Sequence, residues 1–123
     1  MTIPMIDFSP QLMTFDGAPI TEIGTGPDGR PATFNVTLGR ICWNALNNPI
    51  ASEPPIPFDE HMKRYMLAER IKNANPRCPV NAEEIVLIKT RIAKMYTSSL
   101  HAGQAIKLLD PAAAELAEMP KAA

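Results

Sequence analysis

Three sets of residues in this 123-residue chain have the types that functional motifs use, and the first is a glycine-rich turn. Gly24 to Gly29 reads GTGPDG, which matches the GxGxxG spacing of a dinucleotide-binding loop. Such a loop needs a helix directly after it, because the helix N-terminus holds the pyrophosphate. Here Arg30, Pro31 and a β-like run follow, and Pro27 lacks a backbone donor. The segment therefore predicts a turn, and no cofactor is expected.

Metal-ligand types and a possible nucleophile form the other two sets. Cys42, His61, Cys78 and His101 are zinc-ligand types, but every gap exceeds fifteen residues, whereas structural zinc sites use close pairs. His101 lies near Ser98 in the sequence, without a Gly-x-Ser-x-Gly elbow or an obvious orienting acid. We expect no metal site and no catalytic residue, so the chain is not expected to be an enzyme.

Charge and hydropathy argue against several partners. The net charge is −1 with both signs interleaved, so nucleic acid and anionic membranes are not favoured as partners. There is no basic signal-peptide region and no run of 18 apolar residues, so neither export nor a membrane span is expected. A basic group over residues 63–77 predicts a solvated face, with phosphate contact as the alternative. Two distant cysteines favour free thiols in a reducing cytosol.

The strongest structural signal lies over residues 80–110. Asn81 can cap a helix and Glu84 can return the hydrogen bond, which is the pattern of a capping box. Apolar residues then recur at helical spacing, while Arg91 falls outside this apolar face. A second helix is predicted over 100–109, so the stretch predicts a helix–turn–helix pair. The apolar face of the first helix consists of Ile85, Ile88, Ile92, Met95 and Tyr96.

The earlier part of the chain predicts two more helices and a small β element. Helices are predicted over 38–47 and from an Asp59 cap to about residue 74. Strands over 11–15, 19–23 and 32–36, separated by Asp-Gly and Gly-Pro turns, predict a hairpin or meander. A lone hairpin is marginal in water, so it is expected to rest on the helices.

The predicted fold class is α+β, mainly α, with about four helices and a small N-terminal β-hairpin or meander. Residues 1–10 are predicted to form an extended arm that packs on its own domain or adds to a partner. Residues 11–110 form a single compact domain, β-rich over 11–36 and helical over 37–110. Residues 111–123 are an Ala-rich tail.

The helix predicted from Asp59 carries two apolar stripes. A double stripe favours a helix sandwiched between other elements, with exposure of one stripe to a partner as the alternative. Aromatic and aliphatic anchors on half-exposed faces are typical of interfaces. One stripe holds Phe58, Met62, Tyr65 and Met66, and the other Leu67, Ile71 and Ala74. The candidate interface residues are Trp43, Tyr65, Leu67 and Ile71.

Four segments carry a resemblance to a known group. They are DGAPIT over 16–21, TLGRICWNAL over 37–46, AEEIVLIKTRIAKMY over 82–96 and GQAIKLLDP over 103–111. In this order the pattern resembles small proteins of tailed bacteriophages and prophages, encoded among virion and tail-assembly genes, and covers roughly residues 14–111. The resemblance implies the bacterial host cytoplasm or the virion as setting and a role through protein contacts, with no functional residues carried over.

The resulting hypothesis is a non-catalytic protein–protein interaction module, either an assembly chaperone or a minor structural protein of a phage. The alternative is a phage-encoded inhibitor that binds a host enzyme or defence protein. The expected partner is a phage structural protein or a host protein, and a homo-oligomer is left open.

Overall fold

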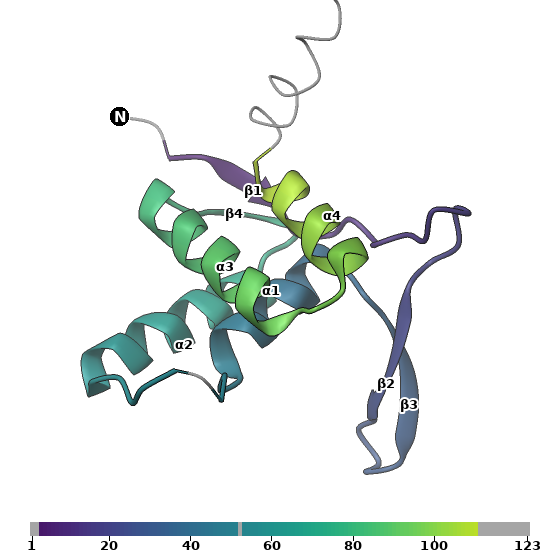
Figure 1. The fold of residues 1–123 in the computed structure, drawn as a ribbon, viewed down its shortest axis with the longest axis horizontal. Coiled ribbons are helices and arrows are strands. Elements are labelled where there is room, and N and C mark those ends of the chain that lie inside the picture. The colour runs from purple at the N-terminus through teal and green to yellow at the C-terminus, as the bar shows by residue number, and fades with distance from the viewer. Residues whose placement is uncertain (1–2, 52, 111–123) are drawn as a thin grey trace, which may run out of the picture.

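The computed structural model describes residues 3–51 and 53–110, and the predicted C-terminal tail lies outside them. Four helices form the body and two short strand pairs accompany them (Figure 1). The predicted α+β, mainly α, fold class is confirmed. In chain order the elements are β1 (Met5–Asp7), β2 (Thr21–Thr25), β3 (Pro31–Asn35), α1 (Leu38–Asn47), α2 (Phe58–Lys72), β4 (Arg77–Pro79), α3 (Ala82–Met95) and α4 (Ser99–Leu109).

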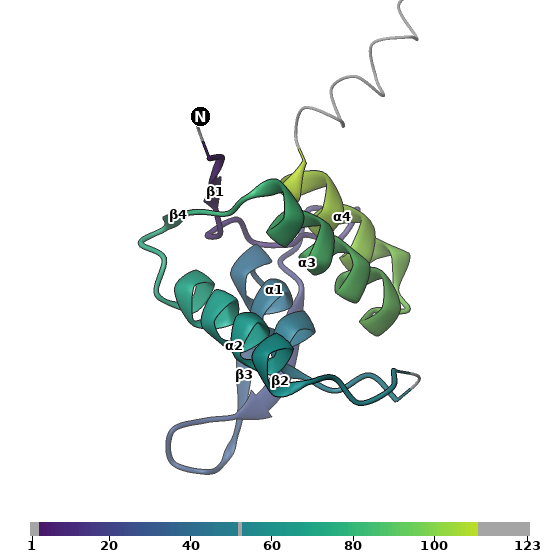
Figure 2. The ribbon, with the colours of Figure 1, turned by 90° about the vertical axis from the view of Figure 1, so that its left-hand side faces the viewer.

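Helix α1 is the centre of the helical body. It lies between α2 on one side and the α3–α4 pair on the other (Figure 1, Figure 2). The Thr37 hydroxyl accepts a hydrogen bond from the Arg40 amide and so caps this helix, as predicted. A helix with partners on two sides buries a wide apolar face. The buried residues of α1 are Leu38, Gly39, Ile41, Cys42, Ala45 and Leu46.

Helices α3 and α4 form the predicted helix–turn–helix pair. The Asn81 side chain accepts from the Glu84 amide at 2.8 Å, and the Glu84 carboxylate accepts from the Asn81 amide at 3.0 Å. This reciprocal pair confirms the predicted capping box. The prediction for Arg91 is wrong, because its side chain is buried with only 3% of its surface exposed.

The described part of the N-terminal arm, residues 3–10, packs on its own domain. Strand β1 pairs antiparallel with β4, placing Met5 opposite Pro79 and Ile6 opposite Cys78. The region predicted to be wholly helical, residues 37–110, therefore contains a strand. This pairing buries Ile6 and Cys78 at the edge of the core.

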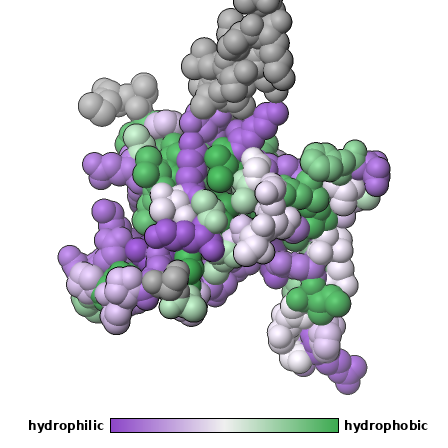
Figure 3. Space-filling view, viewed as in Figure 1, coloured by the Kyte–Doolittle hydropathy of each residue, from purple (hydrophilic) through white to green (hydrophobic). Residues whose placement is uncertain are grey.

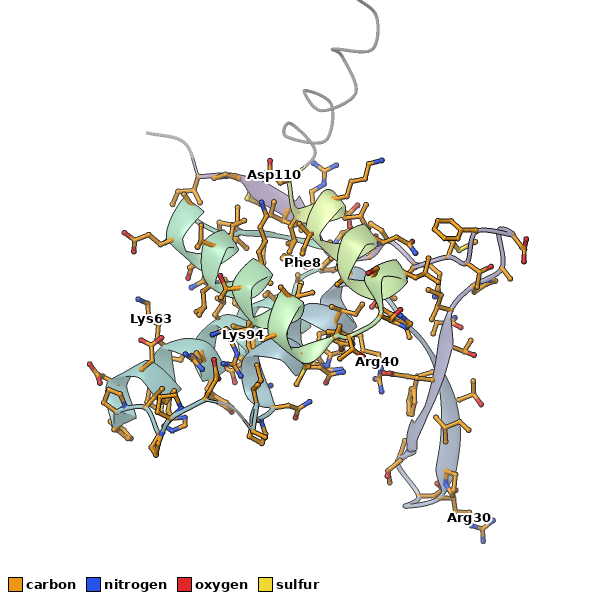
Figure 4. All side chains as sticks on the ribbon, viewed as in Figure 1. Phe8, Arg30, Arg40, Lys63, Lys94 and Asp110 are labelled. Atoms are coloured by element: carbon orange, nitrogen blue, oxygen red, sulfur yellow. The ribbon has the colours of Figure 1, made fainter. Side chains whose placement is uncertain are left out.

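Strands β2 and β3 form a hairpin around the predicted Gly-Pro turn, with Gly29 at φ +79°. The prediction of a first strand over 11–15 is wrong, because those residues make only isolated bridges, at Gln11 and Met13. The expectation that the hairpin rests on the helices is also wrong. It projects away from the helical body (Figure 1), and Figure 4 shows Arg30 at its far end. We call residues 11–36 the β extension; its Leu12, Ile20 and Val36 are buried in the core, while its turn near Phe15 and its hairpin project (Figure 1).

Helix α2 begins one residue before the predicted Asp59 cap. The carbonyl of Pro57 accepts hydrogen bonds from the amides of Glu60 and His61, so the chain is helical from Phe58. Asp59 and Glu60 therefore lie in the first turn, where the helix dipole favours negative charge.

Candidate protein-binding site

One of the two apolar stripes of helix α2 is exposed to solvent. Phe58 is 78% exposed and Tyr65 54% exposed, and Met62 and Met66 are also exposed. On the opposite side Leu67 is only 1% exposed, because α1 packs against that side. The interpretation of α2 as a sandwiched helix is therefore wrong. The exposed stripe, Phe58, Met62, Tyr65 and Met66, is called the outer face of α2 below.

The same burial corrects half of the predicted interface. Leu67 and Ile71 are core residues, with 1% and 2% of their surfaces exposed. Both belong to the hydrophobic core, so they offer almost no surface to a partner. A periodic pattern identifies two stripes on a helix but not which of them meets the core.

The other two predicted interface residues, Trp43 and Tyr65, line one hollow between α1 and α2. It has a volume of about 350 Å³. The Lys72 ammonium lies 4.5 Å from the centroid of the Trp43 ring, so a cation and two aromatic side chains share this site. We call it the aromatic hollow. Its lining residues are Trp43, Asn47, Tyr65, Ala68, Glu69, Lys72 and Asn73.

Arg91 of α3 fixes the end of α1 that borders this hollow. Its guanidinium donates to the carbonyl oxygens of Ala45 at 2.5 Å and Asn48 at 2.8 Å, which lie at the C-terminus of α1. The carbonyls at a helix C-terminus lack partners within the helix, so Arg91 satisfies groups that burial would otherwise leave unpaired. It also donates to the Glu53 carboxylate at 2.5 Å.

Glu53 carries the counter-charge for several bases. It lies 3.7 Å from Arg64 and 3.6 Å from Lys94, in addition to its bond to Arg91. The hydrogen bond from Arg91 lowers the pKa of the Glu53 carboxyl below its usual value. Sequence reasoning missed this network. The available signal was that Arg91 follows Ile88 by three residues and precedes Met95 by four, which places it at the margin of the apolar face.

Most basic residues of α2 contact groups of the same chain. These contacts leave less free positive charge for a phosphate than the sequence pattern suggests. The contacts are Arg64 with Glu53 and Glu60, Arg70 with Glu84 and the Pro79 carbonyl, and Lys72 with the Trp43 ring.

A second exposed apolar region lies on the β extension. Phe15 is 96% exposed and Ile23 79% exposed. Figure 3 shows hydrophobic surface on the segment between β1 and β2 and on the hairpin, both of which project from the body. Arg40 of α1 holds the base of the hairpin through an ion pair with Glu22 and a contact 4.6 Å from the Phe34 ring centroid (Figure 4). The sequence pattern did not mark Phe15, because its exposure depends on the direction in which the β extension leaves the body.

The structure shows the surroundings of the cysteines and of His101, the residues of reactive types. Cys42 and Cys78 are free and buried, and burial raises the pKa of both thiols, which disfavours the reactive thiolate. The His101 ring stacks on Tyr96, and its Nδ1 lies 3.0 Å from the Ser98 hydroxyl. Within residues 3–51 and 53–110, no cluster of three or more His, Cys, Asp or Glu side chains is placed to hold a metal ion.

This chain matches no protein-family model, and the curated proteins and solved structures compared with it give no match either. Among the helices of the described residues, none has the length and apolar character needed to cross a membrane. The interpretation of the site therefore depends on its own geometry.

Proposed function

We propose that this chain is a non-catalytic protein-binding module of a tailed phage, acting as an assembly factor or minor structural protein. Its binding surface is the aromatic hollow together with the outer face of α2. The observation that carries the proposal is the position of three large exposed side chains, Phe58, Met62 and Met66, on the same face as Tyr65, which lines the hollow. Large exposed apolar patches on a folded domain mark interaction sites.

The physical gain from covering this surface is substantial. Burial of each large apolar side chain contributes roughly 1.5–3 kcal/mol. Trp and Tyr are the residues most often found as energetic anchors of interfaces, and Trp43 and Tyr65 flank the hollow. Trp43 is partly buried and packs against the hydrophobic core, so little side-chain freedom is lost when a partner binds.

The phage setting is supported by the resemblance of the four sequence segments between residues 16 and 111. That resemblance favours a partner made in the same infected cell, such as a tail or capsid protein. The alternative, an inhibitor of a host protein, would use the same surface but a partner present before infection.

The test is capture of partners by the tagged full chain from bacterial lysate, with and without phage infection, followed by rebinding of the purified candidate. We expect a virion or tail protein from infected cells, and loss of its binding in Tyr65→Asp. Val86→Asp is the matched control, because Val86 is also apolar and 62% exposed but lies on α3, outside the hollow. Capture of one host protein from uninfected lysate would favour the inhibitor, and equal binding by both variants would reject this surface.

A further inference from the structure

A hydrogen-bonded turn over residues 14–18, between β1 and β2, carries Phe15. The Thr14 amide donates to the Ala18 carbonyl at 2.8 Å, and the Gly17 amide donates to the Thr14 carbonyl at 3.0 Å. Gly17 takes φ +86°, which residues with side chains rarely adopt, so glycine suits this position of the turn. The backbone that carries Phe15 is therefore ordered before binding, so little backbone freedom is lost when the ring enters a partner.

Helix α4 clamps this turn to the helical body. The Gln104 side chain donates to the Met13 carbonyl at 2.6 Å and accepts from the Met13 amide at 3.0 Å. The Leu12 amide donates to the Val36 carbonyl, and the Ile20 amide donates to the Leu12 carbonyl. Phe15 is thus an aromatic side chain with 96% of its surface exposed, on a segment that hydrogen bonds attach to the helical body.

We infer that Phe15 of one copy enters the aromatic hollow of a second copy, so that identical chains join head to tail. This inference rests on the proposed function, because it names a second copy as an occupant of the same surface. Phe15 does not fill the hollow of its own chain, as its exposure shows. The segment that carries it projects from one side of the body and α2 lies on the other (Figure 1).

One acid and one base can pair at the contact, Asp16 with Lys72, in a hollow that Glu69 also lines. Asp16 follows Phe15 directly in the exposed turn, and Lys72 lies at the hollow. Seating Phe15 between Trp43 and Tyr65 therefore brings an acid to a hollow that already holds a cation.

Phe15 and the aromatic hollow are different surfaces of the chain, so each copy offers one of each. We call Phe15 the donor surface and the hollow the acceptor surface. Such heterologous contacts give a closed ring when the rotation between copies closes, and a filament when it does not. The test is sedimentation velocity of the purified full chain over a concentration series, with Phe15→Ser as the donor variant and Tyr65→Asp as the acceptor variant.

We expect the wild type to assemble beyond a dimer and each variant alone to remain monomeric. Loss of a central aromatic anchor should weaken the contact by at least ~30-fold. An equimolar mixture of the two variants should give a one-to-one dimer and nothing larger, because it restores a single intact junction. Ile23→Ser is the control for the donor, since Ile23 is also exposed on the β extension, and it should assemble like the wild type.

A charge exchange tests the orientation. Asp16→Lys should weaken assembly, and its combination with Lys72→Asp should restore it. A monomeric wild type at every concentration, or a mixture of Phe15→Ser and Tyr65→Asp that stays monomeric, would overturn the inference. Capture of a phage protein by the hollow would be unaffected by that result, so failure here is distinguishable from failure of the proposed function.

Discussion

Replacement of Arg91 by Met should show how strongly one buried guanidinium stabilises the fold. The substitution keeps much of the side-chain volume and removes the charge and all donors. Arg91 is 3% exposed and donates to the carbonyls of Ala45 and Asn48 and to the Glu53 carboxylate. Arg91→Met would leave both carbonyls of α1 without this partner.

The expected loss of unfolding free energy is about 3 kcal/mol. Removing one partner of a buried ion pair costs about 3–5 kcal/mol, and a single hydrogen bond to a charged group contributes about 1.5–3 kcal/mol. The lower end applies because Glu53 keeps Arg64 at 3.7 Å and Lys94 at 3.6 Å. Domains of this kind have a total stability of about 5–15 kcal/mol, so the loss would be a large part of it.

The assay is urea unfolding followed by far-ultraviolet circular dichroism. With a slope of about 1–3 kcal/mol per molar urea, the midpoint should fall by roughly 1–3 M. Lys94→Met is the matched control, because Lys94 contacts the same Glu53 carboxylate but is 51% exposed. An exposed pair contributes about 0–1 kcal/mol. A loss below about 1 kcal/mol in Arg91→Met, or equal losses in both variants, would refute the role assigned to Arg91.

Four further predictions follow from burial and contacts. Leu67→Ala should cost about 2–5 kcal/mol in thermal or urea unfolding, because Leu67 is 1% exposed, whereas Tyr65→Ser should stay within about 0.5 kcal/mol. The folded-state pKa of Glu53 is lowered, so its stabilising effect should be complete above pH 4.5 and disappear as pH falls through the folded pKa; urea midpoints of Glu53→Gln should depend less on pH in that range. Arg40→Met should speed hydrogen exchange in β2 and β3 and leave exchange in the helices unchanged. Cys42 should react with a thiol reagent only as fast as the protein opens, and rapid reaction of the native protein would contradict its burial.

The features that the sequence predicted correctly depend on short-range chemistry. The α3 capping box involves only Asn81 and Glu84, which are three residues apart, and their hydrogen bonds form within one turn. The turn at Gly17 and the Thr37 cap of α1 are local in the same sense, since each depends on the residues next to it. The interface role of Trp43 and Tyr65 stays a prediction, made because aromatic anchors on half-exposed faces are typical of interfaces.

The features that the sequence missed depend on contacts between distant segments. Strand β1 forms by pairing with β4, which places Met5 opposite Pro79. No pattern within residues 1–10 identifies β4 as the partner strand. Arg91 is buried because the end of α1 presents free carbonyls to α3. Phe15 became a candidate anchor only when the β extension was seen to leave the body rather than lie on it (Figure 1).

Helix α2 shows most directly which features the sequence determines and which the tertiary structure determines. Its sequence determined that it is a helix with two apolar stripes, because that depends on the spacing of residues along one chain segment. Only the tertiary structure decided that Leu67 faces α1 and that Tyr65 faces water. Both stripes are apolar enough to be buried, and the choice between them depends on where α1 lies, which no residue of α2 encodes alone.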